Sequence, residues 1–329
     1  MEIRTLGATG LPATPIGLGL AAVGRPGYIN VGRERDLGED RSVRAMRDRT
    51  WALVDAAREA GIRYADVARS YGLAELFLGT WLEARGVQPG GLTVGSKWGY
   101  TYTANWQVGA EVNEVKDHSL ATLRRQVDES RALLGPWLRL YQVHSATLES
   151  GILADTGVLR ELARLREEGL AIGLTVSGPR QADAIRAALR VRLDGENPFQ
   201  SVQATWNVLE PSAGPALEEA HRAGWDIIVK EALANGRLAG PWQGSAGAVL
   251  DRLTRARGDA FSPDALAIAA VLAQSWADVV LSGAVTPDQL RSNLRALEVR
   301  LEPAELEALA LLAMPPQAYW EERSELAWT

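Results

Sequence analysis

The chain has 329 residues, 47% of them hydrophobic, and its 41 acidic residues exceed its 35 lysines and arginines, so the formal net charge is −6. This size and apolar content predict an ordinary globular protein, which we expect to form one domain over residues 1–329. Basic residues alternate with acids instead of clustering, which argues against a nucleic-acid-binding surface. The absence of cysteine excludes disulfides and thiolate catalysis.

Membrane and metal functions are also disfavoured. No apolar run reaches the roughly 18 to 20 residues of a membrane span, and the N-terminal residues lack the features of a signal peptide. We therefore expect a cytoplasmic protein without membrane attachment. The three histidines, His118, His144 and His221, are too few and too scattered to predict a metal site. The sequence makes no prediction about self-association.

Short runs rich in Val, Ile and Leu recur along the chain, and each precedes a turn signal and a longer amphipathic segment. This alternation predicts strand-helix units and a parallel sheet. Eight such units favour a closed (β/α)8 TIM barrel over a doubly wound open sheet, because the barrel leaves no sheet edge exposed. The predicted strands are residues 16–20, 62–66, 92–97, 139–144, 171–175, 201–205, 226–230 and 278–282.

Turn and cap signals refine this prediction. Residues 2–16 should form a hairpin, with its turn between Gly7 and Gly10, that closes the bottom of the barrel. Gly61 is expected to end a helix, and the pairs Ser262-Pro263 and Thr286-Pro287 are expected to begin two others. Residues 24–40 and 99–117 lack strong periodicity and should be loops above the carboxyl ends of the strands, where barrel proteins carry function.

The segment GLGLAA, Gly17 to Ala22, matches the dinucleotide fingerprint G-x-G-x-x-G/A literally. That fingerprint requires a helix to start within it, so that helix amides meet the pyrophosphate. Pro26 and the nearby glycines make such a helix improbable. We interpret the match as accidental, and the glycines as a place where the first strand runs close to a ligand.

Polar residues end three successive predicted strands. Asp66 ends the second, Lys97 the third and His144 the fourth, and Tyr71 follows Asp66 by five residues. The carboxyl ends of barrel strands share one face, so these four side chains should converge. Each taken singly has a structural explanation, as a cap, a solvated strand end or a core residue, but the set predicts a catalytic site.

Such a set is suited to proton transfer. A free phenol titrates near about 10, and a lysine ammonium close to it would stabilise the phenolate, while an aspartate would hold the lysine charged. The histidine can donate a hydrogen bond to a carbonyl oxygen. Arg69 and Ser70, between Asp66 and Tyr71, are expected to serve as spacers in contact with solvent.

These segments resemble the aldo-keto reductase superfamily, NAD(P)H-dependent carbonyl reductases built on an eight-stranded barrel. The resemblance covers nearly the whole chain and is carried by RTLGATGLPATPIGLGL, DVARSYGLAELFLGTWL, GSKWGY, and KDHSLATLRRQVDESRALLG leading into LYQVHS. It places the family's catalytic tetrad on Asp66, Tyr71, Lys97 and His144. It implies reduction of an aldehyde or ketone, or oxidation of an alcohol or lactol, with Tyr71 as general acid or base.

The resemblance also implies NADPH or NADP+ as cofactor, with NADH possible, and a small-molecule carbonyl substrate. Thr175 and Val176 replace the family's serine and asparagine, and Trp206 stands near a tyrosine that commonly stacks on the nicotinamide. A basic residue common in the family is missing at 283–285, which leaves Arg237 and Arg291 as candidates for a 2′-phosphate. The implied cofactor contacts are Gly19, Leu20, Thr175, Gln203, Trp206, Leu233, Asn235, Gly236, Arg237, Gly283, Gln289 and Asn293.

Four aromatic residues are expected to bind substrate: Tyr28, Trp98, Tyr100 and Trp106. The aromatic tail, YWEERSELAW, either joins this pocket or packs on the barrel exterior or on another subunit. Two other functions remain open at this point. One is a Schiff-base aldolase or isomerase that uses Lys97, and the other is a non-catalytic subunit like the channel beta subunits of the same superfamily.

Overall fold

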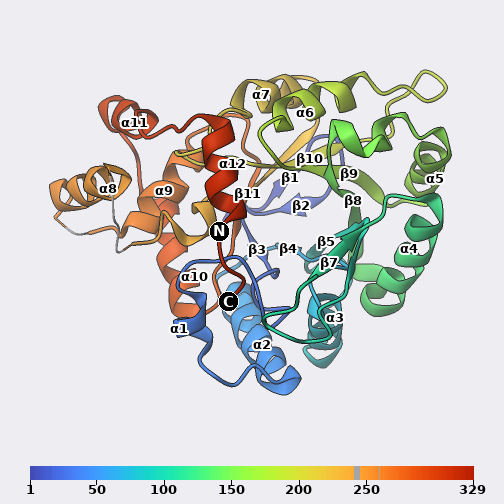
Figure 1. The fold of residues 1–329 in the computed structure, drawn as a ribbon, viewed down its shortest axis with the longest axis horizontal. Helices are drawn as coiled ribbons and strands as arrows, with labels where there is room; N and C mark the ends of the chain where they lie inside the picture. The colour runs from blue at the N-terminus through green and yellow to red at the C-terminus, as the bar shows by residue number, and fades with distance from the viewer. Residues whose placement is uncertain (241–244, 259) are drawn as a thin grey trace.

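The computed structural model describes residues 1–240, 245–258 and 260–329. All eight predicted strands form, and they close a parallel barrel with helices around its outside (Figure 1). The predicted (β/α)8 fold is therefore confirmed. In order around the barrel, the strands are β3 (Ile16–Gly19), β4 (Tyr64–Asp66), β5 (Thr93–Trp98), β8 (Leu138–Ala146), β9 (Ala171–Val176), β10 (Ser201–Thr205), β11 (Asp226–Lys230) and β12 (Val279–Ser282), which pairs with β3.

Most helices pack their apolar sides on the barrel. This agrees with the amphipathic pattern that followed each predicted strand. The α-helices are α1 (Arg33–Leu37), α2 (Val43–Glu59), α3 (Ala74–Ala84), α4 (Leu120–Leu134), α5 (Thr156–Glu167), α6 (Gln181–Arg190), α7 (Gly214–Arg222), α8 (Ser245–Ala256), α9 (Pro263–Leu272), α10 (Pro287–Leu294), α11 (Pro303–Ala310) and α12 (Pro316–Ser324). The buried side chains of α1 to α7, α9 and α10 join those of the strands in one extended core. The buried side chains of α8, α11 and α12 belong to a second apolar cluster, with Leu209 and Leu238.

The predicted helix boundaries are also found. Gly61 follows α2 with a φ of 87°, a left-handed conformation that favours glycine. Helix α10 begins at Pro287, and the Thr286 side chain accepts a hydrogen bond from the Gln289 amide at 3.2 Å. Helix α9 begins at Pro263 as expected. No helix starts within the fingerprint-like segment, because β3 ends at Gly19 and α1 follows only at residue 33.

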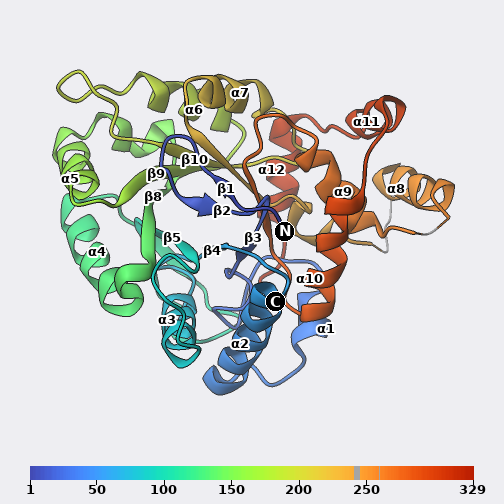
Figure 2. The same cartoon turned by 180° about the vertical axis from the view of Figure 1, so that it is seen from behind.

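The N-terminal hairpin lies across one end of the barrel (Figure 2) and pairs β1 (Arg4–Thr5) with β2 (Pro12–Ala13). Asp226, at the start of β11, accepts hydrogen bonds from the backbone amides of Ala8 and Thr9, both at 3.0 Å. The Gln200 side chain donates to the Ala8 carbonyl at 2.7 Å. These contacts hold the turn under the amino ends of the strands, as predicted.

The opposite end of the barrel carries the two long loops. The first contains the short helix α1, and the second forms an antiparallel hairpin of β6 (Tyr100–Tyr102) and β7 (Glu114–Lys116). Sequence periodicity missed this hairpin because each strand has three residues and its partner is more than ten residues away. Among the helices in the described part of the chain, none has both the length and the apolar content that a membrane crossing requires.

Candidate functional site

A cavity of about 1340 Å³ opens at the carboxyl ends of the barrel strands. Its walls come from both long loops, from the ends of the strands, from the loop after β11 and from the C-terminal segment. Typical ligand pockets enclose roughly 300–1,000 Å³, so this cavity has room for more than one small molecule. Asp66, Tyr71 and His144 line it, as expected from their places at strand ends.

Asp66 and Lys97 form a buried ion pair at the base of this cavity. The Lys97 ammonium donates to Asp66 Oδ1 and to the Val67 carbonyl, the latter at 3.0 Å. Asp66 Oδ2 accepts a hydrogen bond from Gln203 Nε2 at 2.9 Å. Both charged side chains are at most 3% exposed, so each needs the other to compensate for lost hydration. These contacts fix Lys97 beside Tyr71, with its Nζ 4.7 Å from the centre of the phenol ring.

Tyr71 lies between Lys97, His144 and the first long loop. Its ring meets the His144 imidazole edge to face, with centroids 5.6 Å apart. Burial raises the pKa of the Tyr71 phenol well above its ordinary value, and the Asp66 carboxylate raises it further, whereas Arg25 lowers it. From the sequence, the lysine was expected to stabilise the phenolate. In the structure, burial raises the pKa of the phenol more than the nearby cations lower it, so the phenol is neutral at pH 7.

His144 is also neutral at pH 7. Burial lowers the pKa of its imidazole well below the ordinary value, and Lys97, Lys230 and Arg25 lower it further. Its Nδ1 lies 3.4 Å from the Ser70 hydroxyl. Ser70 is fully buried, so the expectation that it merely contacts solvent is wrong.

Arg69 has a structural role that the sequence analysis also missed. Its guanidinium pairs with the buried Glu75 carboxylate at 2.5 Å and with Glu129 at 2.9 Å. Glu75 in turn accepts from the hydroxyls of Ser96 and Ser130. This network ties the turn that follows Asp66 to helices α3 and α4, and so fixes the position from which Tyr71 projects.

A second histidine supports the first. His118 Nε2 lies 2.8 Å from the His144 carbonyl oxygen, and burial is the main cause that lowers the pKa of His118 to about 4. Gly99 makes room for this ring, since a Cβ atom there would lie 2.3 Å from His118 Cδ2. The neutral His118 ring can therefore donate to this carbonyl and hold the end of β8 in place.

Arg25 is a buried cation that the sequence analysis did not single out. Its side chain is 3% exposed, and its Nη1 donates to the Ser70 carbonyl at 3.0 Å and to Glu114 at 2.8 Å. Its guanidinium carbon lies 5.4 Å from the Tyr71 ring centre and 4.7 Å from that of Trp328. No strand ends at residue 25, so no periodic signal marked this position.

The C-terminal segment covers part of the cavity. The backbones of Tyr28 and Thr329 exchange two hydrogen bonds of 3.1 Å, and Arg33 donates to the Thr329 carbonyl. Trp328 meets Tyr28 edge to face, and both Trp320 and Trp328 line the cavity. Of the two placements considered for the aromatic tail, the structure shows the one in the pocket.

Most residues expected to bind cofactor line the same cavity. They belong to four segments that the fold brings together: the end of β3, β10, the loop after β11, and the region from β12 to α10. Two polar atoms in the loop after β11, Asn235 Oδ1 and Arg237 Nη2, are buried and have no partner within the described residues. The lining residues from that prediction are Gly19, Gln203, Leu233, Asn235, Gly236, Arg237, Gly283, Gln289 and Asn293.

Three other predicted cofactor residues do not reach the cavity wall in this structure. Trp206 is largely buried and packs against Trp276, with ring centroids 5.6 Å apart. Thr175 is fully buried, and its hydroxyl accepts from the Ser145 amide at 2.8 Å. Leu20 is a core residue whose amide donates to the Asp66 carbonyl. Strand alternation accounts for Trp206, since Gln203 and Thr205 take the inward positions of β10.

The predicted substrate residues divide in the same way. Tyr28 and Tyr100 line the cavity. Trp98 is fully buried against His118, and Trp106 packs on Phe77 and donates to the Arg41 carbonyl, so neither lines the cavity in this structure.

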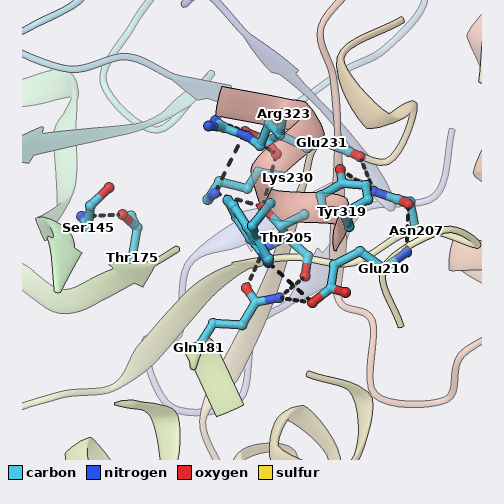
Figure 3. Close-up of polar contacts among 11 residues, drawn as sticks. Ser145, Thr175, Gln181, Thr205, Asn207, Glu210, Lys230, Glu231, Tyr319 and Arg323 are labelled. Carbon is cyan, nitrogen blue, oxygen red and sulfur yellow. Dashed lines mark hydrogen bonds and ion pairs between the residues drawn. The ribbon is translucent and has the colours of Figure 1, made fainter. Parts of the chain in front are cut away.

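A charged cluster of Lys230, Glu231 and Arg323 also lines the cavity (Figure 3) and was not predicted. Lys230 ends β11, and its ammonium donates to the Thr205 hydroxyl at 2.8 Å. The next residue, Glu231, has a φ of 56°, an uncommon conformation for a residue with a side chain. Its carboxylate accepts from Thr205 at 3.2 Å and binds the Arg323 guanidinium through both oxygens. The rule that found Asp66, Lys97 and His144 at strand ends also applies to Lys230.

Carboxylates occupy the end of the cavity near α10. Gln289 Nε2 donates to Asp36 at 2.6 Å, and Asn293 Nδ2 donates to Asp264 at 2.6 Å. Of the two arginines considered for a 2′-phosphate, Arg237 pairs with Glu322 at 2.9 Å, and Arg291 pairs with Asp288 on an exposed face of α10.

The sequence was compared with known families and characterised proteins. The profile of the Aldo/keto reductase family matches residues 15–313. Among curated proteins, the chain is similar to pyridoxal 4-dehydrogenase of Microbacterium luteolum, with 28% identity over 268 residues, which cover 73% of each protein. It is also similar to aldo-keto reductase ausK of Emericella nidulans, with 22% identity over 91% of this chain and 78% of that protein.

Solved structures show the same fold. The glycerol dehydrogenase AKR11B4 from Gluconobacter oxydans superposes with a TM-score of 0.71 over 94% of both chains, at 22% identity. The holo form of aldo-keto reductase AKR11C1 from Bacillus halodurans superposes with a TM-score of 0.70, over 96% of this chain and 97% of that chain, also at 22% identity. These similarities support the barrel assignment independently of the strand pattern.

Proposed function

The chain belongs to the aldo/keto reductase family, which implies an oxidoreductase that carries out NAD(P)H-dependent carbonyl reduction, and we propose that Tyr71 is its general acid and base. The observation that carries this proposal is the position of Tyr71 between His144 and the Lys97–Asp66 pair, at the wall of the large cavity. In reduction, the neutral phenol donates its proton to the carbonyl oxygen as negative charge develops there.

The other tetrad members position this proton transfer. Lys97 places a fixed positive charge beneath the phenol and stabilises the phenolate that reduction leaves behind. We assign the proton of His144 to Nε2, because the Ser70 hydroxyl can then donate to Nδ1. A neutral imidazole of this tautomer donates a hydrogen bond to the carbonyl oxygen and orients it. The hydride itself comes from the reduced nicotinamide when that cofactor is bound.

The described residues fit a nicotinamide dinucleotide. The cavity exceeds the volume of an ordinary small-ligand pocket, and the buried, unpartnered Asn235 Oδ1 and Arg237 Nη2 offer an acceptor and a donor to a polar ligand. Gln203 would hold the nicotinamide carboxamide with its free Oε1, while its Nε2 stays on Asp66. Gly236, Gly283, Gln289 and Asn293 would contact the remaining parts of the cofactor.

We propose NADPH as the preferred cofactor, with NADH as the weaker alternative. Arg35 of α1 lines the cavity beside Asp36, which contacts Gln289, and a guanidinium is the group best suited to a 2′-phosphate dianion. The nearby Asp36 and Asp264 carboxylates act in the opposite sense, since they would accept from ribose hydroxyls. Dissociation constants for both cofactors, measured by quenching of tryptophan fluorescence, decide between them.

The substrate end of the cavity favours a carbonyl compound with a flat or apolar body. Tyr28, Tyr100 and Trp328 present aromatic surface there, and Arg25 adds a cation beside Tyr71. We propose aromatic aldehydes as the first class to test, together with pyridoxal because of the name of one similar protein. Ketones and sugar lactols complete the panel.

Imine chemistry at Lys97 is the competing proposal and has less support. Lys97 is 1% exposed and forms an ion pair with the Asp66 carboxylate, whereas an imine-forming amine must be neutral and within reach of the substrate. Borohydride treatment in the presence of an aldehyde should therefore leave Lys97 unmodified.

The decisive variant is Tyr71→Phe. It removes the acidic proton and keeps the ring that packs on His144, so we expect turnover to fall by at least about a hundredfold. The dissociation constant for NADPH should change less than about twofold, because the phenol oxygen contributes little to cofactor binding. Turnover equal to that of the parent would rule out Tyr71 as the proton donor.

A further inference from the structure

Lys230 is a cation on the cavity wall that the proposed proton transfer does not use. It is one of three lysines in the sequence, and it ends the barrel strand that pairs with β10 in the register Thr205 to Lys230. It shares the cavity with Tyr71, His144 and Gln203. Its charge acts on the tetrad, since it lowers the pKa of His144.

The neighbours of Lys230 hold its ammonium in place and compensate its charge only in part. Its Nζ donates to Thr205 Oγ1 at 2.8 Å and forms a long ion pair of 3.9 Å with the Glu231 carboxylate. The closer partner of Glu231 is Arg323, which donates hydrogen bonds to both carboxylate oxygens (Figure 3). These three charged groups sum to one positive charge, because Glu231 balances only one of the two cations. The strained backbone of Glu231 shows that the fold constrains this arrangement.

A fixed positive charge here has a chemical consequence if the proposed function is right. Hydride transfer moves two electrons and one proton between the substrate carbon and the nicotinamide ring, so the oxidised ring carries one more positive charge than the reduced ring. Any ring that exchanges hydride beside Tyr71 and His144 lies within range of the charge of Lys230, which already acts on His144. The ammonium repels the oxidised ring and leaves the reduced ring unaffected.

We propose that Lys230 discriminates between the two redox states of the bound cofactor, weakening the binding of NADP+ relative to NADPH. On the enzyme, this shifts the equilibrium away from NADP+ and the alcohol, toward NADPH and the carbonyl compound. Lys230 is a positioning and specificity residue in this scheme, and it makes no bond to the reacting atoms. The inference rests on the proposed function, because it requires a nicotinamide in this cavity.

The first test compares dissociation constants in the absence of substrate. The Kd values of NADPH and NADP+, measured by fluorescence for the parent protein, give the ratio Kd(NADP+)/Kd(NADPH). Lys230→Met should lower this ratio by about fivefold, as expected for one charge acting across a partly solvated cavity. Lys230→Arg keeps the charge and should keep the ratio within about twofold. Arg186→Met, on the exposed face of α6, is the remote control and should leave it unchanged.

The second test uses pH and needs no variant at Lys230. Burial is the main cause that lowers the pKa of Lys230 to about 8, with Arg323 and Lys97 also lowering it, and Glu231 and Asp66 opposing them. The ratio should therefore fall between pH 7 and pH 9.5 as the ammonium loses its proton. The measurement is made in the Tyr71→Phe background, so that the phenol cannot titrate. The pKa values of His118 and His144 are lowered from the ordinary imidazole value, so neither ring titrates in this range.

The outcomes separate this inference from the proposed function. If Lys230→Met weakens both cofactor forms equally and the ratio is independent of pH, Lys230 is a phosphate anchor and the inference is wrong. If the parent binds neither NADPH nor NADP+, nor the NADH and NAD+ pair, the proposed function itself fails. A Lys230→Met protein that does not fold leaves the pH experiment on the native lysine to decide.

Discussion

At the scale of single residues, Asp66 is a buried carboxylate on which two other buried side chains depend. Its carboxylate balances Lys97 and also accepts from Gln203. Asp66→Asn preserves the shape but leaves the Lys97 ammonium buried without a counter-charge. We expect a loss of about 3 kcal/mol in the free energy of unfolding, measured by urea denaturation, together with a fall in turnover.

Two further variants distinguish this effect from a general loss of charge. Asp48→Asn removes a carboxylate from an exposed face of α2 and should change the free energy of unfolding by less than about 1 kcal/mol. The double variant Asp66→Asn/Lys97→Met should be more stable than the sum of the two single changes implies, because it removes both buried charges. Additive losses would show that the two residues do not depend on each other.

At the scale of secondary-structure elements, helix α12 is attached to the barrel by the buried rings of Tyr319 and Trp320 and by polar contacts. Arg323 binds Glu231, the residue with the positive φ, and Asn207 donates to the Tyr319 hydroxyl at 3.0 Å. Arg323→Met removes the bidentate partner of the buried Glu231 carboxylate and leaves it only the Thr205 hydroxyl and Lys230 at 3.9 Å, so we expect a loss of about 2 to 3 kcal/mol at pH 7. The exposed pair of Arg291 provides the control, since Arg291→Met should cost at most about 1 kcal/mol.

The same contact predicts the dependence of stability on acid. The neighbouring cations Arg323 and Lys230 overcome the opposing effect of burial and lower the pKa of Glu231 to about 2 in the folded protein, against about 4.3 when unfolded. A lowered folded-state pKa stabilises the protein above the unfolded value, and this stabilisation is lost as the pH falls toward 2. Between pH 7 and pH 3.5, the stability difference between parent and Arg323→Met should narrow by about 1 kcal/mol. A constant difference would contradict this account of the contact.

At the scale of the whole molecule, the two ends of the barrel divide stability from function. The N-terminal hairpin closes the amino ends of the strands through Asp226, and the cavity opens at the carboxyl ends. Asp226→Ala leaves the turn amides of Ala8 and Thr9 without partners, so we expect a loss of about 2 kcal/mol in the free energy of unfolding. The kcat/KM of the folded variant should remain within about twofold of the parent.

The control for this prediction lies on an exposed helix. Asp183→Ala, on α6, removes a carboxylate that is about half exposed, and stability should change by less than about 0.5 kcal/mol. A strong effect of Asp226→Ala on kcat/KM would show that the two ends of the barrel are coupled.

We also propose that residues 1–329 unfold as one domain, so that far-ultraviolet circular dichroism and tryptophan fluorescence report one shared transition.

The fold was predictable because its signals are local. Each strand is a short apolar run next to a turn, and Gly61, Pro263 and Pro287 mark helix ends through backbone geometry alone. The β6–β7 hairpin was missed because its pairing joins distant residues and has too few positions for a periodic pattern. Local patterns therefore determine the barrel, whereas they say little about the loops above it.

The sequence predicted the part of the candidate site that lies at the carboxyl ends of the strands. Asp66, Lys97 and His144 could be placed together because parallel strands in a barrel share one carboxyl end, and the resemblance added Tyr71. Arg25, Ser70 and Trp328 could not be placed, because loops and the C-terminal segment bring them to the cavity. The expected contact of Trp206 with the nicotinamide stays a prediction, and the packing of its ring against Trp276 could not be read from the sequence.

The sequence by itself determined the barrel, the family and the convergence of the tetrad, because these follow from periodicity and from residues at strand ends. Only the tertiary structure decided the protonation states and the charges around the tetrad. Burial raises the pKa of Tyr71 and lowers those of His144 and Lys230, and burial is a property of the assembled molecule. The partly compensated charge of Lys230 likewise appears only when α12 brings Arg323 to Glu231.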